Sequence, residues 1–253
     1  MSPTPAFATL AVPYYIGEPV PEFRIDGVSA LTPAVAEGGA MDRMTSIFDR
    51  LATWVGQHVP VLVQAPDCMA PMGVLAGLQR AGLDPDLVWL DAHGDFNTWE
   101  TTPSGYLGGM PVAMLVGRGD QTMVRGLGIT PLREQRVMLV DARDLDPGEA
   151  AALDGSAVRR LTVSEATGLH LSERPLHIHL DVDIVDPEEL PGLLYPAPGG
   201  PGVAQVAAAL RHLAASPNVV AISIAHTYDH RAESAALSRH VAEELVGAVA
   251  GAI

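Results

Sequence analysis

The chain contains no lysine, so its 15 basic side chains are all arginine and face 30 acidic ones. The resulting net charge of −15 repels a phosphate backbone, which argues against nucleic acid as a partner. The single cysteine, Cys68, excludes an internal disulfide framework and favours a reducing, cytoplasmic setting. No apolar run is long enough to cross a bilayer, and the first residues lack the basic segment of a secretory signal, so we expect no membrane association.

Apolar residues make up 48% of the 253 residues, which is enough to bury a core. Short apolar runs bounded by turn residues alternate with segments of helical periodicity, and no break in composition divides the chain. This pattern predicts one domain over residues 1–253: a three-layer α/β/α sandwich with a central, mostly parallel sheet. The predicted strands cover residues 7–12, 59–64, 87–91, 136–140, 176–181 and 219–224, and the predicted helices cover residues 41–59, 72–80, 203–214 and 231–249.

Acidic side chains follow two of these predicted strands directly. Asp91, His93 and Asp95 alternate with small residues, and in an extended backbone such positions project to one side. Asp181 and Asp183 follow the second strand with the same spacing. Carboxylates a few ångströms apart repel one another, and one or two divalent cations would relieve that repulsion. Carboxylate and imidazole ligands suit Mn²⁺, Fe²⁺, Ni²⁺ or Zn²⁺.

A single cluster of this kind is more often a polar turn that caps the next helix, but two such strand ends in one chain favour a metal site. His177 and His179 precede the second cluster on the same face as Asp181, deeper in the strand. We expect these two histidines to pack or to support the ligands rather than to bind metal themselves.

Five segments resemble the ureohydrolases, the family of arginase, agmatinase and formiminoglutamase. Residues 91–95 match the family motif D-A-H-x-D, and residues 181–187 match D-x-D-x-x-D-P. Residues 101–111 resemble the family's substrate loop, residues 143–149 its R-D-x-D-P-G-E turn, and residues 198–200 its P-G-G element. The resemblance runs in the right order over most of the chain and implies the arginase-type fold.

The resemblance also implies a two-metal site, with Mn²⁺ as the family's usual ion. Asp91 and Asp181 would bridge both ions, His93 and Asp183 would complete one site, and Asp95 would complete the other. Asp95 and His93 are the implied catalytic residues, and Asp95 would orient a nucleophilic water between the ions. Divalent metals lower the pKa of such a water far below about 15.7, so that hydroxide forms near neutral pH.

Three further residues match family contacts to the amino-acid end of the substrate. Asn97 and Ser104 correspond to positions that touch the α-carboxylate, and Asp146 to one that meets the α-ammonium. Each of these residue types is also a common turn former. Their joint presence implies that a head resembling an amino acid is retained.

The departures from the family pattern lie at positions that the resemblance assigns to metal binding, proton transfer or substrate binding. Cys68 stands where a histidine ligand is expected, and a thiolate would favour Zn²⁺ or Fe²⁺ over Mn²⁺, although a lone cysteine is more often an inert core residue. Gly108 replaces a proton-shuttle histidine, and Tyr106 an asparagine. Ser223 aligns with a glutamate that pairs with the guanidinium, and Tyr195 with a threonine.

The sequence therefore predicts a metal-dependent hydrolase of a non-peptide C–N bond in a guanidino or amidino, including N-hydroxyguanidino, amino-acid-like substrate. One alternative is a degenerate metal-binding paralogue without ureohydrolase activity, and another is a hydrolase of a different bond such as an amide. The expected partner is a small molecule, and by resemblance the chain would form a homo-oligomer, a trimer or hexamer.

Overall fold

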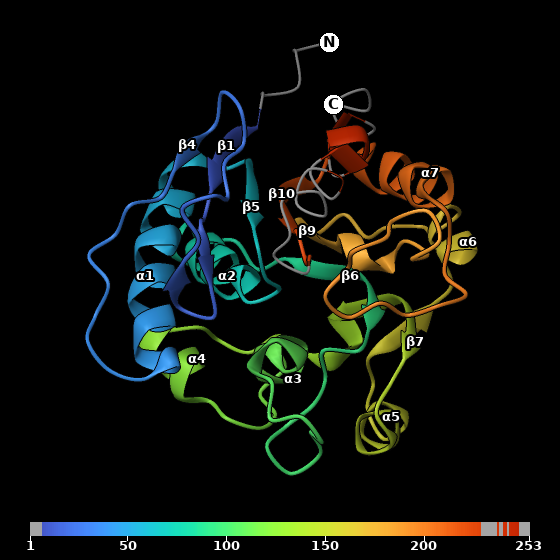
Figure 1. Ribbon diagram of the computed structural model, residues 1–253, viewed down its shortest axis with the longest axis horizontal. Coiled ribbons are helices and arrows are strands. Elements are labelled where there is room, and N and C mark those ends of the chain that lie inside the picture. Colours follow the sequence, from blue (N-terminus) through green and yellow to red (C-terminus); the bar gives the residue numbers. More distant parts are fainter. Residues whose placement is uncertain (1–6, 229–236, 238–239, 242, 248–253) are drawn as a thin grey trace.

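The computed structural model describes residues 7–228, 237, 240–241 and 243–247. Within these residues an 8-stranded sheet has the order β4-β1-β5-β10-β9-β6-β7-β8, and every neighbouring pair is parallel (Figure 1). Among the described helices, none is long and apolar enough to span a bilayer. The strands of the sheet are β1 (Ala8–Ala11), β4 (Ser29–Ala30), β5 (Val61–Ala65), β6 (Asp86–His93), β7 (Val137–Asp144), β8 (Arg159–Leu161), β9 (Leu176–Asp181) and β10 (Val219–Ala225), and β2 (Tyr14–Tyr15) pairs with β3 (Glu18–Pro19) in an antiparallel ribbon.

Helices cover both faces of the sheet, which gives the three layers expected from the sequence (Figure 1). One buried apolar cluster lies between the sheet and the first group of helices, and a second lies under α6 and α7. The first group consists of α1 (Ala40–His58), α2 (Ala70–Arg80), α3 (Pro111–Leu115), α4 (Thr122–Leu127) and α5 (Pro147–Asp154), the second of α6 (Val163–Ala166) and α7 (Val203–Ala214), and short 3₁₀ turns are η1 (Leu107–Gly109), η2 (Glu134–Arg136) and η3 (Val182–Ile184).

Every strand predicted from the sequence is present, and the parallel fold is confirmed. The helices predicted over residues 41–59, 72–80 and 203–214 are α1, α2 and α7. The helix predicted over residues 231–249 lies largely outside the described residues, although residues 237, 240–241 and 243–247 are helical. The short helices α3 to α6 were not predicted, because one or two turns show too little periodicity.

Alternation along the three central strands separates a polar row from an apolar one. Trp89, His179 and Ser223 lie side by side in register on β6, β9 and β10 and face the α1–α2 layer. Their neighbours Ile178 and Ile222 belong to the cluster on the opposite face. Asp91 and Asp181 follow Trp89 and His179 by two positions and therefore lie on the same side of the sheet. The fold thus brings the acidic ends of β6 and β9 to one edge of the sheet.

Helix α2 lies very close to α1 because glycines form its contact surface. A Cβ atom at Gly77 would lie 2.5 Å from the Cβ of Val55 and 2.7 Å from the carbonyl oxygen of Ala52. Contacts this short do not occur between real side chains, so the two backbones approach only because Gly77 lacks one. This approach also positions the turn that contains Cys68, which directly precedes α2.

We predict that Gly77→Ala lowers the free energy of unfolding by about 1–3 kcal/mol, the usual cost of overpacking a core. The same change in an unobstructed helix stabilises by about 0.5–1 kcal/mol. Gly247→Ala is the matched control, because a Cβ there meets nothing within 4 Å. Urea unfolding of both variants measures the difference, and equal stabilities would show that the α1–α2 contact is looser than described.

Candidate metal centre and active site

Four aspartates gather at the carboxyl edge of β6 and β9. Asp91, Asp95, Asp181 and Asp183 are each no more than 4% exposed. A cavity of about 390 Å³ opens beside them. The residues that line it include Cys68, His93, Asp95, Asn97, Ser104, Tyr106, Gly108, Asp144, Asp146, Glu149, Asp183, Tyr195 and Thr227. All the predicted site residues therefore lie at this cavity or, for Asp91 and Asp181, in contact with residues that line it.

Hydrogen bonds and a turn, rather than the alternation of side chains along a strand, set the positions of the acidic residues at the end of β6. Asp91 accepts hydrogen bonds from the backbone N–H of His93, at 2.7 Å, and from the indole N–H of Trp89, at 3.0 Å. The pairing with β7 shifts register between Asp91 and His93, and Asp95 has a φ of 49°. The sequence prediction that an extended backbone aligns all three side chains was thus wrong for Asp95, which reaches the site through a strained, left-handed turn.

The end of β9 is arranged in a similar way. Asp181 accepts hydrogen bonds through Oδ1 from the backbone N–H of Asp183, at 3.0 Å, and from the hydroxyl of Thr227, at 2.7 Å. Asp183 itself lies in η3, beyond the strand. Its Oδ2 is 3.2 Å from Nδ1 of His93, which lies 3.3 Å from Oδ1 of Asp91. His93 therefore links the two acidic clusters.

Burial and the charges of neighbouring side chains together set the electrostatics of this cluster. Burial and the neighbouring carboxylates raise the pKa of Asp95 and Asp181 well above the usual range, and that of Asp183 to about 6. Burial opposes ionisation of Asp91 too, but hydrogen bonding and the charge of His93 lower the pKa of Asp91. Burial likewise disfavours charged His93, yet the carboxylates of Asp183 and Asp91 raise the pKa of its imidazole to about 12.

Two buried carboxylate oxygens in the cluster, Oδ2 of Asp95 and Oδ1 of Asp183, have no hydrogen-bond partner. Buried polar atoms without a partner are rare and costly. Oxygen and imidazole donors at close range, with oxygens left unsatisfied, fit divalent cations. Asp91, His93 and Asp183 offer donor atoms within 4.8 Å of one another, which is compatible with one such ion.

Cys68 lies in the turn between β5 and α2 and points at this cluster. Its thiol donates to Oδ2 of Asp181 at 2.7 Å. Burial first, and then the charge of Asp181, raise the pKa of the Cys68 thiol well above its ordinary value. The sequence predicts Cys68 as a metal ligand, and the structure shows it in contact with Asp181, which the resemblance implies as a bridging ligand.

The residues predicted to hold the substrate head also lie together. The side-chain amide of Asn97 donates to Oδ2 of Asp146 at 2.9 Å. Glu149, a residue to which the sequence reading gave no role, is 3% exposed and accepts hydrogen bonds from the backbone N–H groups of Phe96 and Asp146. Burial raises the pKa of Glu149 to about 7. Glu149 ties the turn after Asp95 to the loop that carries Asp146.

Two more cavity residues were missed from the sequence. Oδ2 of Asp144 lies 3.9 Å from Nε2 of His93. Asp144 belongs to the R-D-x-D-P-G-E turn, two residues before Asp146, so this motif could have indicated it. Thr227 is the second residue beyond the end of β10, and its bond to Asp181 depends on strand pairing that no motif marks.

The family model described as "Arginase family" matches residues 35–247. The chain belongs to the arginase family. It is 34% identical over 152 residues to an arginase of Bacillus subtilis, covering 55% of this chain and 51% of that enzyme. It is 32% identical over 200 residues to an N(omega)-hydroxy-L-arginine amidinohydrolase of Streptomyces lavendulae, covering 77% of this chain and 68% of that enzyme. The matched part thus spans between about half and two thirds of these relatives.

Solved arginase structures share the fold over nearly the whole chain. The arginase of Entamoeba histolytica in complex with L-ornithine superposes with a TM-score of 0.78 at 18% identity, covering 97% of this chain and 99% of that one. An arginase of Bacillus subtilis superposes with a TM-score of 0.78 at 23% identity, covering 98% and 99%. At these identities the likeness establishes the arginase-type fold alone.

Against the family pattern, Tyr106 and Gly108 form a matched pair. A Cβ atom at Gly108 would collide with the ring and hydroxyl of Tyr106. The Tyr106 hydroxyl is 3.0 Å from that of Tyr15, and its ring centroid is 5.0 Å from that of Tyr195. In this arginase-family chain, a tyrosine ring thus occupies the space beside residue 108, where the resemblance implies a histidine.

Ser223, aligned with the guanidinium-binding glutamate, lies inside the sheet rather than at the cavity. It is 1% exposed and its hydroxyl is 2.9 Å from both His177 Nε2 and His179 Nδ1. The residue from the end of β10 that lines the cavity is Thr227. Ser223 therefore contributes to the polar row of the sheet, and no carboxylate from this position reaches the cavity.

We predict that Asp181→Ala abolishes tight binding of divalent metal while the protein stays folded, because the variant loses the carboxylate between Cys68 and Thr227. Metal per chain is measured by elemental analysis, and the thermal stabilisation that metal gives the wild type should vanish. The matched control is Asp86→Ala, which removes a buried aspartate at the other end of β6, bonded to Arg136 and Arg174. Unchanged metal content in Asp181→Ala would contradict the assignment.

We also predict that Gly108→His lowers the melting temperature, because the new side chain collides with Tyr106. In the double variant with Tyr106→Asn the histidine has room, so the two changes should couple favourably by about 1–3 kcal/mol. A double-mutant cycle by thermal and urea unfolding measures this coupling. Strictly additive effects would show that Tyr106 moves aside freely.

Proposed function

We propose that this chain is a metal-dependent hydrolase that cleaves a non-peptide C–N bond in a guanidino or amidino amino-acid-like substrate. The observation that carries the proposal is the buried group of four aspartates beside a cavity, with Oδ2 of Asp95 and Oδ1 of Asp183 left without partners. Asp91, Asp181, His93 and Asp183 would hold one divalent cation, and Asp91, Asp181 and Asp95, with Cys68, a second. Bound cations would supply Lewis acidity and a nucleophilic hydroxide near neutral pH.

The chain's own residues account for orientation and proton handling. Oδ2 of Asp95 faces the cluster without a partner and would accept a hydrogen bond from the attacking water. Its strained backbone fixes that oxygen, since φ of 49° is a conformation the surrounding contacts must enforce. Glu149 supports this arrangement by accepting a hydrogen bond from Phe96, the next residue, at 2.7 Å.

Other residues that line the cavity suit an amino-acid head. Asn97 and Ser104 supply polar groups for a carboxylate, and Asp146 and Asp144 supply negative charge for an ammonium. The hydroxyl of Thr101 donates to the Asn97 side chain at 2.9 Å, and Asn97 donates to Asp146, so the amide is held in one orientation. A volume of about 390 Å³ falls within the range of small-molecule sites.

The tail of the substrate should be less basic than guanidinium. Position 223 carries a serine, so it supplies no carboxylate to pair with a guanidinium. A buried cation that lacks its ion partner costs about 3–5 kcal/mol. An N-hydroxyguanidine is less basic and needs that partner less. The 32% identity to an N(omega)-hydroxy-L-arginine amidinohydrolase supports this choice of tail. The retained aspartates argue against a degenerate paralogue that binds metal without catalysis.

By family resemblance we further propose two divalent ions per chain, Mn²⁺ or a softer ion, a homo-oligomeric state (trimer or hexamer) and a cytoplasmic location. Light scattering on the purified protein tests the oligomeric state.

We predict low activity on L-arginine, with kcat/KM below about 10⁴ M⁻¹s⁻¹. Agmatine should be no better, because it lacks the carboxylate that Asn97 and Ser104 would bind. N-hydroxy-L-arginine and formimino amino acids should be hydrolysed faster, since their tails are less basic or smaller. Product formation by metal-loaded protein is followed by mass spectrometry.

Asn97→Ala should raise KM for the preferred substrate and lower kcat, because binding energy from a remote head group orients the reacting group. The matched control is Asn218→Ala, which removes a side chain that bonds to the carbonyl of Ser172 outside the cavity.

Two outcomes would contradict the substrate prediction. Hydrolysis of L-arginine by the wild type at ordinary enzyme rates would show that the departures from the family pattern matter little. Metal-loaded protein inactive on every substrate would favour the degenerate paralogue.

A further inference from the structure

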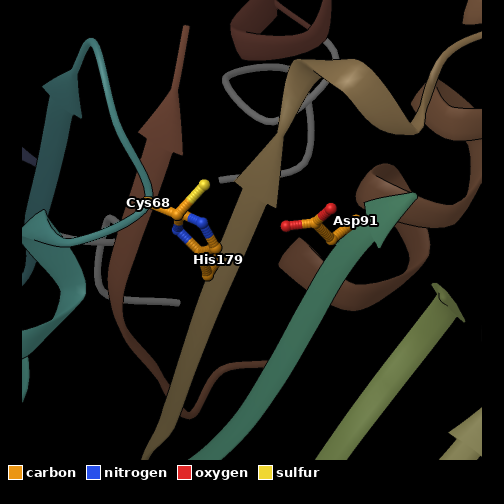
Figure 2. Close-up of side chains that lie close together, drawn as sticks. All are labelled: Cys68, Asp91 and His179. Carbon is orange, nitrogen blue, oxygen red and sulfur yellow. The ribbon is translucent and has the colours of Figure 1, made fainter. Parts of the chain in front are cut away.

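Cys68, His179 and Asp91 form a second possible ligand group, at the inner end of the metal centre. Their donor atoms all lie within 4.8 Å of one another, and all three residues are buried. Figure 2 shows that they come from the turn after β5, from β9 and from β6, with the Asp91 carboxylate pointing toward the other two side chains. The group contains one sulfur, one nitrogen and one carboxylate donor.

His179 carries the observation that points to a ligand. Its side chain is fully buried, and Nε2 has no hydrogen-bond partner. Its other nitrogen, Nδ1, lies 2.9 Å from the Ser223 hydroxyl, and the ring lies 3.9 Å from that of Trp89. This imidazole is fixed on two sides, its remaining nitrogen is unsatisfied, and one of its ring nitrogens lies within 4.8 Å of the Cys68 thiol and the Asp91 carboxylate. Core packing does not explain this arrangement.

The neighbouring hydrogen bonds leave Nε2 able to bind a cation. Ser223 contacts both His177 and His179, and its hydroxyl has one proton to donate. When that proton goes to Nε2 of His177, Nδ1–H of His179 donates to Ser223, and Nε2 of His179 keeps its lone pair available for a cation. Metal-binding histidines are commonly oriented by such a bond through the other ring nitrogen.

We propose that Cys68 Sγ, His179 Nε2 and the Asp91 carboxylate bind a soft divalent cation, Zn²⁺ or Co²⁺, in preference to Mn²⁺. His179 then supplies, from β9, the imidazole that the family pattern places at position 68. Thiolate and imidazole select softer ions than an all-oxygen set does. This inference deepens the proposed function, because it names the ion and a ligand that the family motifs do not contain.

Cobalt provides the test, because thiolate bound to Co²⁺ gives a near-ultraviolet charge-transfer band that oxygen ligands do not give. Metal-free wild-type protein is titrated with Co²⁺, alongside Cys68→Ser and His179→Gln. The matched control is His226→Gln, which alters a buried histidine bonded to Gln64 instead. Zinc-edge X-ray absorption of the wild type adds a measurement that needs no variant, with a sulfur neighbour expected at about 2.3 Å.

The wild type and His226→Gln should show the band, and Cys68→Ser should lose it. His179→Gln should weaken Co²⁺ binding by more than about 100-fold, beyond the roughly 10–100-fold expected if His179 only supported another ligand. Absence of the band and of a sulfur neighbour in the wild type, or unchanged Co²⁺ affinity in His179→Gln, would overturn the inference. Such a result leaves the proposed hydrolysis standing, whereas a sulfur-bound ion without turnover on any substrate refutes the hydrolysis alone.

Discussion

The mutual repulsion of buried carboxylates at one edge of the sheet is the constraint on which the site depends. Asp91, Asp95, Asp181 and Asp183 are held together by backbone N–H groups, by Trp89 and by His93, yet two of their oxygens remain without partners. Such carboxylates are stable together in a folded protein only when some are protonated or when positive charge compensates them. Next to the left-handed turn at Asp95, the backbone N–H of Phe96 donates to the buried Glu149, and this contact holds the turn.

Departures from the arginase pattern occur in this chain as spatially coupled changes. Gly108 makes room for the ring of Tyr106, so the loss of one polar side chain beside the cavity accompanies the gain of another. Cys68 faces His179, which brings an imidazole back to the same region from a different strand. Coupled replacement of this kind alters the lining of the cavity while the parallel sheet and its acidic strand ends are kept.

The strands and long helices were predictable because buried parallel strands are short apolar runs and amphipathic helices repeat every three or four residues. The residues of the candidate metal centre were predictable as a set, since both acidic clusters lie at the ends of strands. Their geometry was not. Asp95 reaches the site through a left-handed turn and Asp183 through η3, and neither conformation follows from the extended spacing assumed for the motif.

The sequence by itself determined the fold class, the acidic strand ends and the family, because these depend on local periodicity and on motifs contiguous in the chain. Only the tertiary structure decided which side chains from different strands meet. His179 was expected to pack or to support the ligands, and its unsatisfied nitrogen emerges only when β10, β9 and β6 are placed side by side. Contacts such as Cys68 with Asp181, 113 positions apart, depend on strand order, which local patterns do not encode.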